Sequence, residues 1–154
     1  MKDLPNALRN NHIWKDTYEL AEYIYRKIDE MLDNFPDEKW STVAKLRNSA
    51  NDSLFYVAQS IGNSTTDGAE YDWSNARKNL FSLQTMYIFA CKQKFLELDP
   101  EIVVKIDKLL KEINANIATV KKEAENKAKK ELEPWLEKYS LWKEMQGDDP
   151  KSGK

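Results

Sequence analysis

Apolar residues recur every three or four positions through most of this chain, which is the spacing of helices that bury one face. The most apolar window is 80–95, LFSLQTMYIFACKQKF, in which Leu80, Leu83, Tyr87 and Ala90 share one helical face. Other apolar residues surround that face, and a helix that is apolar on most of its circumference must be covered on several sides. We therefore expect this window to form the innermost helix of an all-helical bundle.

Proline, glycine and polar segments divide the pattern into four long helices. The clearest loop is 62–68, GNSTTDG, and Asp99-Pro100 provides a helix cap followed by a proline suited to the first turn. We expect the helices to cover 13–33, 37–61, 69–96 and a segment starting at Pro100.

The fourth helix has a strong apolar stripe up to Val120, and its character then changes. Residues 121–133, KKEAENKAKKELE, mix lysine and glutamate, which is typical of a solvated helix that extends beyond a bundle. Pro134 is expected to start a separate short helix. This interpretation gives an N-terminal arm (1–12), a four-helix bundle (13–132), a short C-terminal helix (133–146) and a disordered tail (147–154).

The composition and charge of the chain bear on its cellular location and on the partners that it can bind. The 154 residues suit one domain, and a net charge of −2 gives no whole-protein attraction to nucleic acid or acidic membranes. The longest unbroken apolar run, 86–91, is far shorter than the roughly 20 residues of a membrane span, so no membrane partner is expected. A single cysteine, Cys91, and an N-terminus without an apolar signal segment favour a cytoplasmic protein.

Residues that carry out catalysis are scarce. The chain has one histidine, His12, and no Glu-x-x-His pair of the kind that binds two metal ions in helical bundles. None of the four glycines belongs to a phosphate-binding loop, and Cys91 lies in the most apolar window, where it is expected to pack as a small hydrophobe. We therefore expect no enzymatic activity, no catalytic residue, no metal and no cofactor.

Basic residues on the expected helices are candidates for contacts to nucleic-acid phosphates. If the second and third helices are neighbours, their basic residues could form one strip, and such a strip releases counterions on binding. The alternative is an ordinary solvated charge pattern. The candidates are Lys15, Lys45, Arg47, Arg77 and Lys78.

The chain also has more aromatic residues than a core of this size needs, with five Trp and seven Tyr. Aromatic residues are enriched at protein interfaces. Candidates for a subunit or partner interface are Trp14, Trp40, Trp73 and the C-terminal group of Trp135, Tyr139 and Trp142. The alternative is that these side chains pack within their own bundle.

Several motifs together resemble a known family. They are IWKDTYELAxxIYR at 13–26, FPDE at 35–38, Leu46-Arg47 with Ala50, and Val57-Ala58. Over residues 13 to 120 the chain resembles the small four-helix bundle proteins encoded by intervening sequences in bacterial large-subunit ribosomal RNA genes. It also resembles their close relative, the accessory variability determinant of diversity-generating retroelements.

The resemblance implies both a fold and a function. The implied fold is all-α, an antiparallel up-and-down four-helix bundle, here with an extended fourth helix and a short C-terminal helix, assembled as a homo-oligomer that is typically a pentamer. The implied function is that of a non-enzymatic accessory protein that binds RNA and a reverse transcriptase. The alternative is a protein–protein interaction scaffold of the ribosomal intervening-sequence type, without nucleic-acid binding, that docks through its Trp-rich tail.

Overall fold

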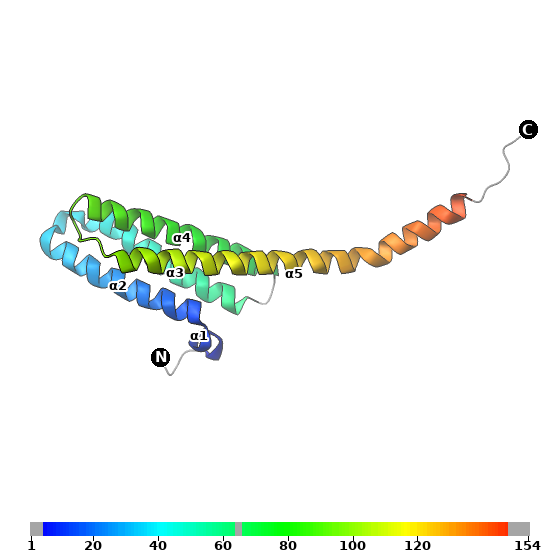
Figure 1. Cartoon of the computed structure of the whole chain (residues 1–154), viewed down its shortest axis with the longest axis horizontal. Coiled ribbons are helices and arrows are strands. Elements are labelled where there is room, and N and C mark those ends of the chain that lie inside the picture. The colour runs from blue at the N-terminus through cyan, green and yellow to red at the C-terminus, as the bar shows by residue number, and fades with distance from the viewer. Residues whose placement is uncertain (1–4, 64–65, 148–154) are drawn as a thin grey trace, which may run out of the picture.

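The computed structural model of this protein describes residues 5–63 and 66–147, and every regular element in those residues is a helix (Figure 1). The predicted all-α class is therefore confirmed. Helix α1 lies inside the segment 1–12, for which the sequence predicts an N-terminal arm. The elements are α1 (Asn6–Asn10), α2 (His12–Asn34), the 3-10 helix η1 (Pro36–Trp40), α3 (Thr42–Gly62), α4 (Thr66–Lys92) and α5 (Pro100–Gly147).

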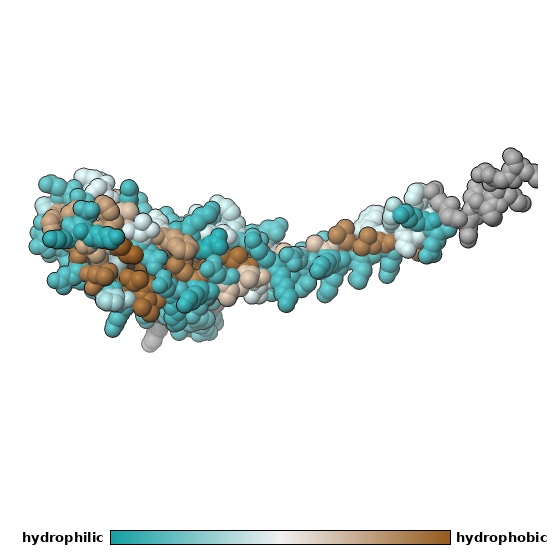
Figure 2. Space-filling view, turned by 45° about the horizontal axis from the view of Figure 1, so that its top comes forward, coloured by the Kyte–Doolittle hydropathy of each residue, from teal (hydrophilic) through white to brown (hydrophobic). Residues whose placement is uncertain are grey.

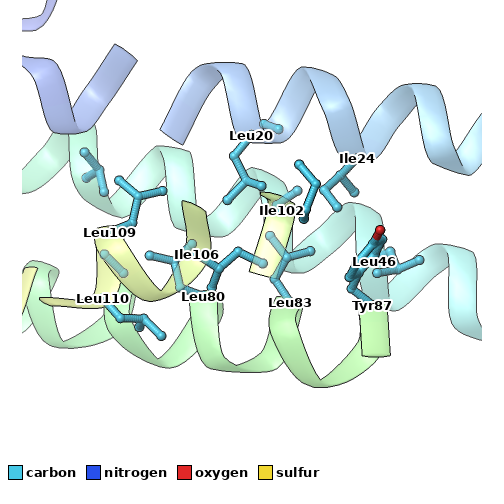
Figure 3. Packing of buried hydrophobic residues seen from close by; sticks show 14 of the residues in the cluster. Leu20, Ile24, Leu46, Leu80, Leu83, Tyr87, Ile102, Ile106, Leu109 and Leu110 are labelled. Carbon is cyan, nitrogen blue, oxygen red and sulfur yellow. The ribbon is translucent and has the colours of Figure 1, made fainter. Parts of the chain in front are cut away.

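The long helices lie side by side around a shared core, and α5 continues far beyond the others (Figure 1). Helix α3 packs against α2 and α4, while α5 packs against α4 and α2. We call α2, α3, α4 and residues 100–120 of α5 the body, and residues 121–147 of α5 the extension. Figure 3 shows part of the core, where the four long helices contribute Leu20, Ile24, Leu46, Leu80, Leu83, Tyr87, Ile102, Ile106, Leu109 and Leu110.

Most of the apolar window 80–95 lies in α4, where it is buried on one side only. Leu80, Leu83 and Tyr87 are buried between neighbouring helices, which confirms the face that they were expected to share. Phe81 and Phe89 point away from that face and are exposed. The expectation that α4 is covered around most of its circumference is therefore wrong, because its described neighbours α3 and α5 flank only its inner side.

Helix α4 ends at Lys92, earlier than the apolar pattern predicts. Lys94 has a positive φ of 62°, and its N–H donates to the carbonyl of Cys91 at 3.0 Å. The next N–H, of Phe95, donates to the carbonyl of Ala90 at 2.9 Å. This pair of bonds is the Schellman ending of a helix, and its left-handed position is here occupied by lysine instead of the usual glycine.

The second long helix starts later than predicted, because residues 36–40 form the 3-10 helix η1. Ser41 then has non-helical dihedral angles (φ −111°, ψ −95°), which separate η1 from α3. The Glu38 side chain accepts a hydrogen bond from the Ser41 hydroxyl and one from the Thr42 N–H, the latter at 3.4 Å. Glu38 therefore caps the first turn of α3.

Helix α5 begins as the sequence predicts and ends differently. The Asp99 carboxylate accepts a hydrogen bond of 2.9 Å from the Glu101 N–H, so Asp99 caps the helix and Pro100 is its first residue. The predicted separate helix at 133–146 is wrong, because α5 continues through Pro134 to Gly147. Proline removes one backbone hydrogen bond and its ring crowds the preceding turn, yet the turns on both sides remain helical. The remainder of the predicted disordered tail, 148–154, lies outside the described residues.

Candidate functional site

The extension is exposed along nearly all of its described length. After Val120 it leaves the body, and Figure 2 shows apolar side chains gathered along part of it. Trp135, Tyr139 and Trp142 are 67%, 55% and 52% exposed, respectively. Leu132 and Leu136 are also exposed. A contiguous set of exposed large apolar side chains is rare on a monomeric protein and marks an interaction site.

The apolar residues of the extension continue the buried face of α5. Within the body this face carries Ile102, Ile113 and Ile117, all buried. At 100° per residue, Ile102 and Trp142 lie about 40° apart around the helix axis, so they share one side of the helix. We call the following residues the stripe, because they continue that side outward: Ala124, Ala128, Leu132, Trp135, Tyr139 and Trp142.

The aromatic side chains of the stripe are ordered relative to one another. The rings of Tyr139 and Trp142 stack, with centroids 6.0 Å apart and planes inclined by 27°. The ammonium group of Lys138 lies 5.5 Å from the centroid of the Trp135 ring, and that of Lys143 lies 5.4 Å from the Tyr139 ring. Lysines thus border an apolar surface, which is the arrangement of an interface core with a polar rim.

The other aromatic candidates divide into two groups. Trp14 and Trp73 are buried in the core of their own chain, and Trp14 stacks on Tyr18 with centroids 5.4 Å apart. Trp40, at the end of η1, is 84% exposed. Four further aromatic residues are exposed but were not predicted as interface candidates: Phe55, Tyr71, Phe81 and Phe89. Their positions on the helix sides opposite the buried residues are the sequence signal that could have identified them as exposed.

The predicted basic residues do not form one strip, although α3 and α4 are neighbours. Arg47 is half-buried and faces α2, with its guanidinium 5.8 Å from the centroid of the Tyr25 ring. Arg77 faces α5 and donates a hydrogen bond of 3.3 Å to the side chain of Asn114. The two arginines therefore lie at different helix seams.

The three predicted lysines are exposed and spread over the body. Lys45 of α3 borders a surface hollow beside Phe89 of α4. Lys78 of α4 lies eleven residues before Phe89, which is roughly 16 Å along the helix. Lys15 lies on α2, the helix that packs against α3 and α5. Lys45 and Lys78 are therefore separated along the body.

A polar cluster joins α2, α4 and the start of α5. The Tyr23 hydroxyl donates a 2.8 Å hydrogen bond to the Asp99 carboxylate, and the Asp99 N–H donates one of 3.0 Å to the Tyr87 hydroxyl. Burial and the Asp99 carboxylate raise the pKa of Tyr23, and burial raises the pKa of Tyr87. Both phenols therefore stay protonated near neutral pH and hold the chain turn between α4 and α5 in place.

The described residues with metal-binding or nucleophilic side chains lie apart or are partly buried. Among residues 5–63 and 66–147, no three His, Cys, Asp or Glu side chains are grouped to hold a metal ion. Burial raises the pKa of the Cys91 thiol, which disfavours the reactive thiolate. Cys91 and Glu30 border the same hollow, whereas His12 lies near Glu112, 3.6 Å away, at the other end of α2.

No helix in the described part of the chain is long and apolar enough to cross a membrane. No protein-family model and no curated protein matches the sequence.

Proposed function

We propose that this protein is a non-enzymatic interaction protein of the cytoplasm, in which a four-helix bundle holds out a docking helix. The stripe on the extension carries this proposal. The stripe is apolar and exposed, and it lies on the same side of α5 as the residues buried in the body. The extension therefore carries an apolar face that no described part of the chain covers.

The proposed bundle has an antiparallel up-and-down topology, supported by polar pairs along the helix seams. Between α2 and α5, Glu19 pairs with Lys105 at 2.7 Å and Asp16 with Lys108 at 3.0 Å, so residue numbers rise in one helix as they fall in the other. The pairs between α4 and α5 show the same opposite order of residue numbers. Its pairs are Glu70 with Lys121 at 3.3 Å, Arg77 with Asn114 at 3.3 Å and Gln84 with Asp107 at 2.7 Å.

The docking role is tested by co-purification from cells that express the protein. The tagged full-length chain is compared with a variant in which Trp135, Tyr139 and Trp142 are replaced by alanine. A matched control carries Glu133→Ala, Glu137→Ala and Ser140→Ala, which lie outside the stripe on the same extension. We expect specific partner chains, including untagged copies, to be lost with the stripe variant and retained with the control. Equal recovery with all three proteins contradicts the docking role.

The resemblance supports a second candidate function, that of a homo-oligomeric, typically pentameric, accessory protein for a reverse transcriptase and its RNA. The observation in its favour is that Lys15, Lys45 and Lys78 are exposed and accessible to phosphates. An RNA mobility-shift assay at low and moderate salt tests it, since phosphate contacts make affinity fall steeply with salt. Replacing the three lysines with glutamine should weaken binding, and an absence of binding at low salt excludes this role.

A further inference from the structure

We propose that the extension pairs with the extension of a second copy of this chain, forming an antiparallel two-helix coiled coil. This inference rests on the docking role proposed above and names the partner. The centre of the pair lies between Leu132 and Trp135.

The spacing of the stripe is that of a coiled coil. From Ala128 to Trp142 the steps are four, three, four and three residues, which gives a period of 3.5. Positions repeating in this way face one partner helix along their whole length. Pro134 falls outside the stripe, so its ring does not interrupt the contact face. The face is therefore suited to one long helix.

The sizes of the stripe residues favour a second copy in the antiparallel direction. The first half carries Ala124 and Ala128, and the second half carries Trp135, Tyr139 and Trp142. In an antiparallel pair centred between Leu132 and Trp135, each small residue meets a large one. The layers are Ala128 with Tyr139 and Leu132 with Trp135, each formed twice, and Ala124 lies one residue from the position opposite Trp142. A parallel pair would set alanine against alanine at one end and tryptophan against tryptophan at the other, and such mismatched layers pack poorly.

Charges beside the stripe agree with this register. Glu131 and Lys138 occupy the same flanking position in successive heptads, and in the antiparallel pair each lies opposite the other residue of the second copy. In a parallel pair, Lys138 of one chain would instead lie near Lys143 of the other. Residues 121–147 contain seven lysines and six glutamates, so two extensions approach without strong repulsion.

The available area suffices for a specific contact. Seven large apolar side chains that the structure describes in the extension are each more than half exposed, and five of them lie on or beside the stripe: Leu132, Trp135, Leu136, Tyr139 and Trp142. If each of these five buries roughly 100 Å² on pairing, two copies bury about 1,000 Å² together, near the lower limit for a specific interface. We therefore expect a reversible pair.

Light scattering of the full-length protein at about 10 µM tests the pairing, because an interface of this size is expected to associate at micromolar concentrations. The wild-type mass should be at least twice that of the Trp135→Ala, Tyr139→Ala, Trp142→Ala variant, because each wild-type chain gains a partner through its extension. The control with Glu133, Glu137 and Ser140 replaced by alanine should keep the wild-type mass. Equal masses for wild type and stripe variant overturn the pairing. If the stripe variant nevertheless loses a different protein partner, the docking role survives without self-pairing.

Cysteine cross-linking tests the direction of the pair. In a Cys91→Ser background, one preparation carries Glu131→Cys and another Lys138→Cys. Oxidation of the mixture should join the two kinds of chain, while each preparation alone should cross-link at least fivefold less. Cross-links that form within each preparation and not between them overturn the antiparallel arrangement.

Discussion

The hydroxyl of Tyr23 in α2 donates a hydrogen bond of 2.8 Å to the carboxylate of Asp99, the residue that caps α5. This bond connects residues 76 positions apart in the sequence and fixes the start of the longest helix against α2. The bond is partly buried and has a charged acceptor, so replacing Tyr23 with phenylalanine should lower the free energy of unfolding by about 1.5–3 kcal/mol. Urea unfolding followed by circular dichroism at neutral pH measures this loss. Tyr25→Phe, which removes an exposed hydrogen bond to Asn51, is the control and should lose less.

The same contact predicts how stability changes in alkali. The pKa of Tyr23 is raised above its ordinary value of 10.0, first by burial and then by its bond to Asp99, so the folded chain holds this proton more tightly than the unfolded chain. The resulting stability is complete below pH 10 and is lost as the pH rises from 10 toward the folded-state pKa. The unfolding free energy of the wild type should therefore fall above pH 10. The Tyr23→Phe variant should show a shallower fall, and an identical slope would show that Tyr23 does not contribute.

Lys94 predicts a stabilising substitution. Its φ of 62° lies in the left-handed region, which costs a residue with a side chain roughly 1–2 kcal/mol and costs glycine little. Lys94→Gly should therefore raise the unfolding free energy by about 1 kcal/mol while keeping the Schellman bonds that end α4. The same change two residues earlier, Lys92→Gly, falls in the last helical turn and should destabilise by up to about 1 kcal/mol. Thermal unfolding of the two variants gives opposite shifts if the conformation at Lys94 is the cause.

Ile113 and Trp142 lie on the same side of α5, but replacing each with alanine should change the free energy of unfolding by different amounts. Ile113 is fully buried in the body, so Ile113→Ala should cost about 2–5 kcal/mol of stability through lost burial and the cavity that remains. Trp142 is exposed on the extension, so Trp142→Ala should change the unfolding free energy of the body by less than about 0.5 kcal/mol. Both values come from urea unfolding of the full chain followed by circular dichroism, at a protein concentration low enough to keep the chains unpaired. A large loss from Trp142→Ala in the unpaired chain would mean that the chain itself covers the stripe.

The helical class and the core faces of α3, α4 and the first part of α5 could be predicted, because apolar spacing reports which side of a helix is buried. The cap at Asp99 was predictable for a similar local reason. The end of α4 was not, because lysine at position 94 gives no sign of the left-handed conformation that glycine would announce. The prediction of one basic strip on α3 and α4 was not met for another reason. A sequence shows that Arg47 and Arg77 are basic, but not that one faces α2 and the other α5.

The sequence shows the aromatic residues of the candidate site, but it does not show that they lie on one continuous helix. In the sequence, Pro134 indicates a helix break and therefore predicts a separate short helix that carries Trp135, Tyr139 and Trp142. Continuity of α5 through Pro134 joins them to the alanines before it and makes one stripe. Local rules assign proline to helix starts, but one proline within an otherwise favourable helix removes one hydrogen bond and crowds one turn without ending the helix.

Pro134 therefore sets the local stability of the extension. Its nitrogen has no hydrogen to donate to the carbonyl of Lys130, and Figure 1 shows the extension changing direction part-way along. Pro134→Ala restores this bond and should stabilise the helix locally by up to about 3 kcal/mol. Amide hydrogen exchange should slow at residues 131–138, with little change in the body. Ser140→Ala, an exposed substitution that restores no backbone bond, is the control and should leave exchange there nearly unchanged. Unaltered exchange in Pro134→Ala would mean that the break in the backbone ladder does not limit the stability of the extension, and that the stripe behaves as a single rigid face in spite of the proline.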